Sequence, residues 1–290
     1  MRSIPESELI LNADGSIYHL NLLPEDIADT IITVGDQDRV AEVSSLFDSV
    51  ELKKGKREFI THTGLIGSKR ITVISTGIGT DNIDIVLNEL DALVNVDFST
   101  RQEKIDKKSL DIIRIGTSGA IQEDIAIDTI LVTEYAVGLD ALMQYYSQSL
   151  TLEEEHFKRS IESHFEGLFT FIPYVAEADK ELLSTVGKSI KQGITITAPG
   201  FYAPQGRMLR ARGSVDNLIK GFQNFNYNNR RLTNLEMETA GIYALSKALG
   251  HRAISINAIL ANRVTNEFSK QPQKIINQAI KDTLEKIILI

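Results

Sequence analysis

Strand-like and helix-like segments alternate along the chain, and this alternation limits the possible folds more than any other feature of the sequence. Residues 30–34 (Thr-Ile-Ile-Thr-Val) predict a buried strand, and apolar residues at helical spacing follow at Val40, Val43 and Leu46. The pattern recurs as far as an amphipathic helix expected over residues 269–290. Such alternation is typical of a sheet covered by helices on both faces, so we predict an α/β fold.

The chain has the size and composition of one large domain. Its 290 residues, 42% of them hydrophobic, suffice for a sizeable core, and no repeat or Pro/Ser-rich linker divides them. We therefore expect a single domain over residues 1–290. The polar segment around residues 95–110 is expected to be a solvated extension or a helical insertion within that domain.

Charge and composition argue against several classes of protein. The net charge of −8 disfavours nucleic-acid binding by bulk charge, and the absence of cysteine rules out a disulfide framework and suits a reducing compartment. Residues 1–10 lack the apolar core of a signal peptide, and no apolar run is long enough to cross a bilayer. We expect a cytoplasmic protein with no nucleic-acid or membrane partner.

Two segments have the residues that an anion site needs. Residues 35–39 (Gly-Asp-Gln-Asp-Arg) follow the first strand, where glycine lets backbone N–H groups approach an anion and Arg39 adds positive charge. A Gly-Asp turn also ends strands for purely structural reasons. Arg114 lies in the strand predicted over residues 111–116 and needs a partner, either a structural carboxylate or a bound anion. The hydroxyl-rich turn expected at residues 117–120 favours the anion.

A further glycine turn, Ser75-Thr76-Gly77-Ile78-Gly79-Thr80, leads into a helix expected over residues 83–93. Gly77 and Gly79 lack a third glycine at the spacing of the dinucleotide-binding motif. No acidic residue downstream is placed to bind the ribose of such a cofactor. We therefore reject a dinucleotide site.

The segment from Asn234 to Gly241 carries two carboxylates on either side of a methionine. A carboxylate can accept hydrogen bonds from neighbouring ribose hydroxyls, and a thioether can lie against the apolar face of a sugar or base. We therefore hypothesise a sugar site at Glu236, Met237 and Glu238. The structural alternative is an ordinary helix start, in which Asn234 is the N-cap and the acidic residues suit the helix dipole.

A loop restrained by proline and glycine follows the strand expected over residues 192–197. It carries Phe201, Gln205 and Arg207, which suit a planar ring with amide groups. The aromatic side chain can stack on the ring, glutamine offers both a donor and an acceptor, and arginine donates. A loop with one packed phenylalanine and two solvated side chains is the structural alternative.

Five blocks, in this order and spacing, resemble the nucleoside phosphorylase-I superfamily over about residues 18–262. The blocks are Tyr18-His19-Leu20, Gly35-Asp36-Gln37-Asp38-Arg39, Ser75-Thr76-Gly77-Ile78-Gly79, Arg114-Ile115-Gly116-Thr117-Ser118-Gly119-Ala120 and Glu236-Met237-Glu238. The resemblance implies a single-domain, three-layer α/β/α phosphorylase fold with a central mixed β-sheet.

The loop pattern Phe201-Tyr202-x-x-Gln205-Gly206-Arg207 resembles the uridine-cleaving branch of this family. Purine-cleaving members typically place an aspartate near the end of the late strand, where residues 258–263 (Ala-Ile-Leu-Ala-Asn-Arg) offer no acid. The resemblance therefore implies a pentosyltransferase of pyrimidine nucleoside salvage that phosphorolyses uridine reversibly. The alternatives are a purine or broad-specificity phosphorylase, a nucleosidase that uses water, and a non-catalytic nucleoside-binding protein.

The resemblance also implies roles for individual residues, with Arg114, Gln205 and Arg207 in the catalytic roles. Phosphate would be bound by Gly35, Arg39, Arg57, Arg114 and Thr117. Ribose would be bound by His19, Glu236, Met237 and Glu238. The base would be bound by Phe201, Gln205 and Arg207.

In this family His19 and Arg57 would reach the site of a neighbouring subunit, so the resemblance implies a homo-oligomer built from dimers with shared active sites. Phosphate is then a co-substrate, and neither an organic cofactor nor a catalytic metal is expected. The family's occasional monovalent-cation site is matched in part by Glu58, whereas Asn82 stands where a serine is common. Whether a monovalent cation binds near Glu58 therefore stays open.

Overall fold

The structure is a computed structural model, and it describes residues 3–289. Within these residues, eleven strands form one mixed sheet in the order β13-β12-β8-β10-β11-β7-β1-β4-β3-β2, with β9 paired to β8. The strands are β1 (Thr30–Val34), β2 (Ser49–Lys56), β3 (Phe59–Ile66), β4 (Lys69–Ser75), β7 (Asp111–Ala120), β8 (Ile130–Gly138), β9 (Tyr174–Glu177), β10 (Lys191–Thr197), β11 (Leu232–Glu236), β12 (Arg252–Asn262) and β13 (Glu267–Phe268).

Part of this sheet closes into a ring, and β7 is one of the strands of that ring. The N-terminal half of β7 is parallel to β1, and its whole length pairs in parallel with β12. β12 in turn pairs with β8, β8 with β10, and β10 with β11. Near its end β7 pairs in antiparallel with β11, through Gly119 and Ala120. Strand β7 therefore joins the open part of the sheet to a closed ring of five strands.

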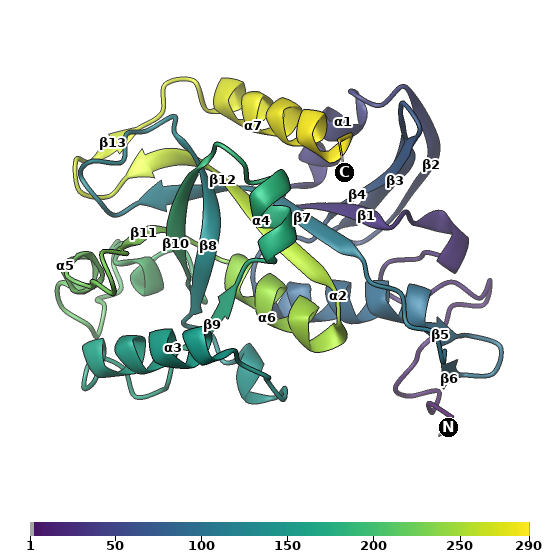
Figure 1. The fold of residues 1–290 in the computed structure, drawn as a ribbon, viewed down its shortest axis with the longest axis horizontal. Coiled ribbons are helices and arrows are strands. Elements are labelled where there is room, and N and C mark those ends of the chain that lie inside the picture. Colours follow the sequence, from purple (N-terminus) through teal and green to yellow (C-terminus); the bar gives the residue numbers. More distant parts are fainter. Residues whose placement is uncertain (1–2, 290) are drawn as a thin grey trace.

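Helices cover both faces of the sheet, and Figure 1 shows α1 and α7 on one side and α2 and α6 on the other. The α-helices are α1 (Gln37–Ser44), α2 (Thr80–Asn95), α3 (Leu152–His164), α4 (Lys180–Thr185), α5 (Leu218–Gln223), α6 (Thr239–Leu249) and α7 (Pro272–Ile287). Short 3₁₀ helices are η1 (Pro24–Asp26), η2 (Leu142–Gln144) and η3 (Ala203–Gln205). None of these helices is long and apolar enough to cross a membrane.

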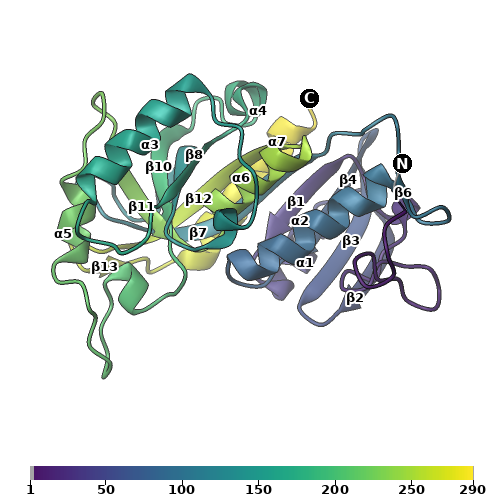
Figure 2. The same cartoon turned by 90° about the horizontal axis from the view of Figure 1, so that it is seen from below.

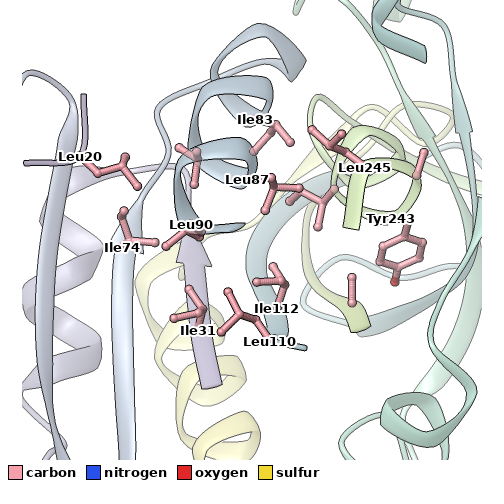
Figure 3. Packing of buried hydrophobic residues seen from close by; sticks show 14 of the residues in the cluster. Leu20, Ile31, Ile74, Ile83, Leu87, Leu90, Leu110, Ile112, Tyr243 and Leu245 are labelled. Atoms are coloured by element: carbon pink, nitrogen blue, oxygen red, sulfur yellow. The ribbon is translucent and has the colours of Figure 1, made fainter. Parts of the chain in front are cut away.

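Successive side chains of β1 enter different cores, because neighbouring residues of a strand point to opposite faces. Ile31 packs with α2 and α6, whereas Ile32 packs with α1 and α7. Figure 3 shows Leu87 and Leu90 of α2 in the first of these clusters, and Figure 2 shows α2 and α6 side by side over the sheet. A third cluster packs α3 and α5 against the ring. The layers confirm the predicted three-layer α/β/α fold with a mixed sheet.

Two local predictions near the ring are wrong for the same reason. Asn234 is not an N-cap, since it lies within β11, and α6 begins only at Thr239. Residues 117–120 are not a turn, because β7 continues to Ala120. In both segments the backbone pairs with strands that are distant in the sequence, and short polar residues at those positions hide this pairing from local pattern analysis.

The polar segment around residues 95–110 is a small hairpin of β5 (Val96–Asp97) and β6 (Gln102–Glu103), so the helical alternative is wrong. The Asp97 carboxylate accepts hydrogen bonds from the backbone N–H groups of Ser99 and Thr100 and stabilises the turn. The terminal helix begins at Pro272 rather than Ser269, whose hydroxyl donates to Asp128. The end expected at residue 290 lies outside the described residues.

Candidate functional site

A cavity of about 780 Å³ opens beside the C-terminal half of β7. Its walls come from places that are far apart in the sequence: the turns after β1, β2 and β4, the strand β7, the loop that holds η3, the junction of β11 and α6, and the ends of β12 and β13. In sheets with parallel strands, binding sites form at the carboxyl ends of strands, and the ends of β1, β4 and β11 contribute here.

Ten of the twelve predicted site residues line this cavity. They are Gly35, Arg39, Arg114, Thr117, Phe201, Gln205, Arg207, Glu236, Met237 and Glu238. His19 and Arg57 do not line it. The structure thus brings together residues from four segments of the sequence, and the roles assigned to them remain predictions.

One end of the cavity has the features of an anion site. Gly35 follows β1, and the Asp36 carboxylate caps α1 by accepting from the N–H of Asp38 at 3.0 Å. Arg39 is half-buried in the first turn of α1, and within residues 3–289 its guanidinium has no ion pair or hydrogen bond. Burial lowers the pKa of Arg39, and nearby Arg114 lowers it further, while Asp36 opposes both. A bound anion would supply the partner that this cation lacks.

Arg114 is buried and ion-paired at the base of the same end. Its Nη2 lies 2.6 Å from a carboxylate oxygen of Glu238 and 3.0 Å from one of Glu236. Burial works to lower the pKa of Arg114, and the two carboxylates outweigh it and raise the pKa. Thr117, the residue after Gly116 on the same strand, has a hydroxyl with no hydrogen-bond partner in the described part of the chain.

The two carboxylates differ in the number of hydrogen bonds that they already accept from the protein. Glu236 accepts hydrogen bonds from the Thr197 hydroxyl at 2.6 Å and from the backbone N–H groups of Glu238 and Thr239, so it caps α6. Within residues 3–289, the Glu238 carboxylate accepts only from the N–H of Gly79, at 2.9 Å, and from Arg114. Each oxygen of Glu238 can therefore accept a further hydrogen bond. Burial raises the pKa of Glu238, Arg114 opposes this, and Glu236 adds to it.

The loop at the other end holds a glutamine and an arginine together. Gln205 is buried, and its Oε1 accepts from Nη1 of Arg207 at 2.6 Å. The Arg207 guanidinium lies 3.9 Å from the centroid of the Phe201 ring and donates to the Phe201 carbonyl. One face of Phe201 is thus covered by a cation–π contact, and a base can stack only on the other face.

Sequence analysis missed the role of Arg263 in holding this loop. Its Nη1 donates to the backbone carbonyl of Gln205 at 2.7 Å, and its aliphatic stem lies next to Gly119. Burial lowers the pKa of Arg263, and burial together with the nearby Arg263 charge lowers the pKa of Arg207 to about 10. The sequence did contain a signal for this role, since Arg263 directly follows the late strand. The structure shows that this end of β12 borders the cavity.

His19 and Arg57 lie elsewhere, on the part of the surface around Tyr18. His19 Nδ1 lies 2.6 Å from the Glu89 carboxylate, which also accepts from the backbone N–H groups of His19 and Leu20. Arg57 is exposed in the β2–β3 turn with a positive φ of 56°, and its guanidinium lies 6.0 Å from the centre of the Tyr18 ring. Their assignment to a neighbouring subunit's site stays a prediction.

Within residues 3–289, no cluster of three or more His, Cys, Asp or Glu side chains has the arrangement of a metal site. Glu58 and Asn82, considered for a monovalent cation, both line the cavity next to Gly77.

Comparison with known proteins places the chain in a family. The Phosphorylase superfamily matches residues 29–288. The uridine phosphorylase of Thermococcus kodakarensis is 31% identical over 286 residues, covering 92% of this chain and 87% of that protein. A Purine nucleoside phosphorylase DeoD-type of Shewanella loihica is 24% identical and covers 94% of this chain and 98% of that protein.

A solved structure extends the similarity to the fold. The nucleoside phosphorylase of Trypanosoma brucei, whose structure is described as showing uridine phosphorylase activity, superimposes with a TM-score of 0.88 at 29% identity. The superposition covers 97% of this chain and all of that chain. The matched residues include every wall of the cavity, from Gly35 to Phe268. The chain therefore belongs to the Phosphorylase superfamily.

Proposed function

We propose that the protein catalyses the reversible phosphorolysis of uridine to uracil and ribose 1-phosphate. The observation that carries this proposal is the arrangement inside one cavity of the Arg39 cation, which has no partner among the described residues, an available carboxylate at Glu238 and the Gln205–Arg207 pair. These groups suit phosphate, ribose and a pyrimidine carbonyl edge respectively. The uridine phosphorylases among the relatives support the same assignment.

Phosphate would bind between the turn at Gly35 and the side chains of Arg39, Arg114 and Thr117. The arginines neutralise and orient the anion through charge-assisted hydrogen bonds. When phosphate is held below the anomeric carbon, the two reactants are already in the geometry for attack, which lowers the barrier. The negative charge of the phosphate also stabilises the positive charge that develops on the sugar. The reaction then needs no covalent nucleophile from the protein.

Glu238 would bind the ribose hydroxyls, and Met237 would lie against the sugar. Glu236 has a different task, because its oxygens are engaged by Thr197 and by the N-terminus of α6. We assign Glu236 the role of holding the backbone of Met237 and Glu238 in the conformation that places their side chains in the site. The order of these three residues then reads as one structural carboxylate, one apolar contact and one ribose ligand.

The uracil would lose its bond to the sugar as an anion, stabilised by Arg207 and Gln205. Arg207 lies fixed by three contacts within its own loop, so its N–H groups are preorganised before the base arrives. Gln205 accepts from Arg207 through Oε1, which leaves the amide N–H₂ to donate to a carbonyl of the base. The end of β12 at residues 258–263 supplies no acid for a purine ring.

We further propose that the protein acts in the cytoplasm as a homo-oligomer of dimers, with His19 and Arg57 completing the partner's ribose and phosphate sites. No organic cofactor or catalytic metal takes part in the proposed reaction, and phosphate is the co-substrate. The exposed position of Arg57 outside its own cavity supports the shared arrangement.

Turnover of uridine and inosine at saturating phosphate tests the choice of base. We expect uridine to give uracil and ribose 1-phosphate, identified by chromatography, and inosine to react far more slowly. Faster phosphorolysis of inosine would move the protein to the purine-cleaving members of its family.

A further inference from the structure

Asn257 lies at the centre of a buried polar region inside the ring of strands. Its side chain is completely buried, and in the register of β12 with β7 it lies opposite Gly116. Its Oδ1 accepts from Nη1 of Arg114 at 2.9 Å, and its Nδ2 donates to the hydroxyls of Thr133 and Ser255, each at 3.2 Å. Asn257 itself does not line the cavity.

The chemistry of these partners fixes the orientation of the amide. Arginine can only donate, so the Asn257 oxygen must face Arg114. The nitrogen then faces Thr133 and Ser255, whose hydroxyls can accept. A reversed amide would place N–H groups against a guanidinium and leave buried donors without acceptors, which is costly.

Asn257 holds Arg114 without neutralising it. Nη2 of Arg114 is paired with Glu236 and Glu238, whereas Nη1 is held by the neutral amide. A third carboxylate in this place would add negative charge beside the proposed phosphate site. Gly116 makes the contact possible, since a Cβ at that residue would lie 2.0 Å from Nη1 of Arg114.

A chain of buried hydrogen bonds continues from Asn257 back to the cavity wall. The Thr133 hydroxyl bonds to that of Thr195 at 2.6 Å, and Thr195 donates to the Asn234 oxygen at 3.2 Å. Asn234 then donates to the hydroxyl of Ser118, which lines the cavity, at 3.0 Å. Every member is buried, so each bond restricts its neighbours.

We propose that Asn257 is a positioning residue that holds the Arg114 guanidinium in the geometry for phosphate, with the chain from Thr133 to Ser118 fixing its amide. This inference rests on the proposed function, because it takes phosphate to be the anion that Arg114 meets. It assigns Asn257 a task in binding phosphate and none in contacting uridine.

The test measures the phosphate KM, the uridine KM and, by calorimetry, the phosphate Kd of Asn257→Leu. Hydrogen bonds to charged groups predict a rise of about ten- to a hundredfold in both phosphate constants. The uridine KM should change by less than about threefold. Thr133→Val leaves Asn257 in place and removes one acceptor of its amide, so its phosphate constants should rise by about two- to tenfold.

The matched control is Asn95→Leu. Asn95 is also buried, and its amide bonds to Asp91 and to the backbone of Lys108, away from the cavity. The Asn95→Leu variant should have a lower free energy of unfolding and an unchanged phosphate KM and Kd. Unchanged phosphate constants in a folded Asn257→Leu would overturn the proposal, and if that variant does not fold, unchanged constants in Thr133→Val would do so. The phosphate Kd from calorimetry tests the role of Asn257 even if the wild-type protein does not cleave uridine. A wild-type protein that binds phosphate without cleaving uridine would contradict only the proposed function.

Discussion

At the scale of single residues, the charged groups of the cavity divide into those that the protein satisfies and those that it leaves available. Glu236 is saturated by Thr197 and the start of α6, whereas Glu238 retains acceptor capacity. Arg114 is held at Nη1 and at Nη2, and Arg39 is unpaired among the described residues. The two available groups, Arg39 and Glu238, are both among the residues that we assign to substrates.

Arg207→Ala tests whether the loop arginine stabilises the leaving base. Loss of one preorganised donor typically lowers turnover by about a hundred- to a thousandfold. Among the described residues, the Arg207 side chain bonds only to Phe201 and Gln205 of its own loop, so the free energy of unfolding should change little. Steady-state kinetics and chemical denaturation measure the two effects. Arg210→Ala, an exposed neighbour in the same loop, is the control, and equal losses of turnover and stability in Arg207→Ala would mean that this arginine is structural.

Gly116→Ala tests the space that Arg114 occupies. The added methyl group would lie 2.0 Å from Nη1, so the guanidinium must move away from Asn257. Because the clashing atoms are the end of a flexible side chain, we expect a rise of about tenfold or more in phosphate KM with a modest loss of stability. Gly213→Ala, whose methyl group would meet no atom within 4 Å, serves as control. A Gly116→Ala enzyme with wild-type phosphate KM would show that this position of Arg114 is not the functional one.

At the scale of helices and strands, the site depends on where elements end. Strands β1, β4 and β11 each stop at the cavity, and the helices that follow them begin with groups the site uses, such as Arg39 in α1 and Gly79 before α2. We expect the packing of α2 and α6 on the sheet to contribute more to the position of these ends than contacts within the cavity do.

Leu87→Ala tests this separation between packing and chemistry. Leu87 of α2 is completely buried in the cluster of Figure 3, and truncation of such a leucine typically lowers the free energy of unfolding by about 2–5 kcal/mol. At a temperature where the variant is folded, its uridine and phosphate KM should stay near wild type. Denaturation curves compare it with Leu46→Ala, where the leucine is exposed and the loss should be small. A large rise in either KM without loss of stability would contradict this view.

The sequence predicted elements with strong apolar patterns and missed those defined by distant pairing. Helix α2 and strand β1 have clear periodicities and were predicted, whereas Asn234 was considered a helix N-cap because its strand neighbours are distant in the chain. Strand β2 was missed, since its largely exposed edge position requires no apolar alternation. Most candidate site residues were found through the family resemblance, and Arg263 and Asn257 were missed because their partners lie across the fold.

At the scale of the whole molecule, the surface around Tyr18 borders the cavity, because Glu58, which follows Arg57, and Gln37, which donates to the Arg57 carbonyl, both line the cavity. His19 and Arg57 belong to that surface, where Glu89 holds His19 with Nδ1 engaged. Sites shared between subunits would explain why two residues of the family motifs lie outside the cavity that collects the other ten.

Mixing subunits tests this arrangement. His19→Ala and Arg207→Ala proteins should each have low uridine turnover, because each lacks one group in every site. If His19 serves the partner's site, a dimer formed from one subunit of each kind contains one intact site and one doubly altered site. Mixed and reassembled proteins should therefore recover part of the wild-type activity, whereas a mixture as inactive as its components would contradict shared sites.

The central claim is that the arginine-lined end of the cavity holds phosphate as the attacking nucleophile. Uracil release from uridine, followed by absorbance with and without inorganic phosphate, tests it most directly. We predict release that requires phosphate and saturates with it, with ribose 1-phosphate as the second product. Equal release in the absence of phosphate would identify water as the nucleophile and contradict the roles of Arg39 and Arg114.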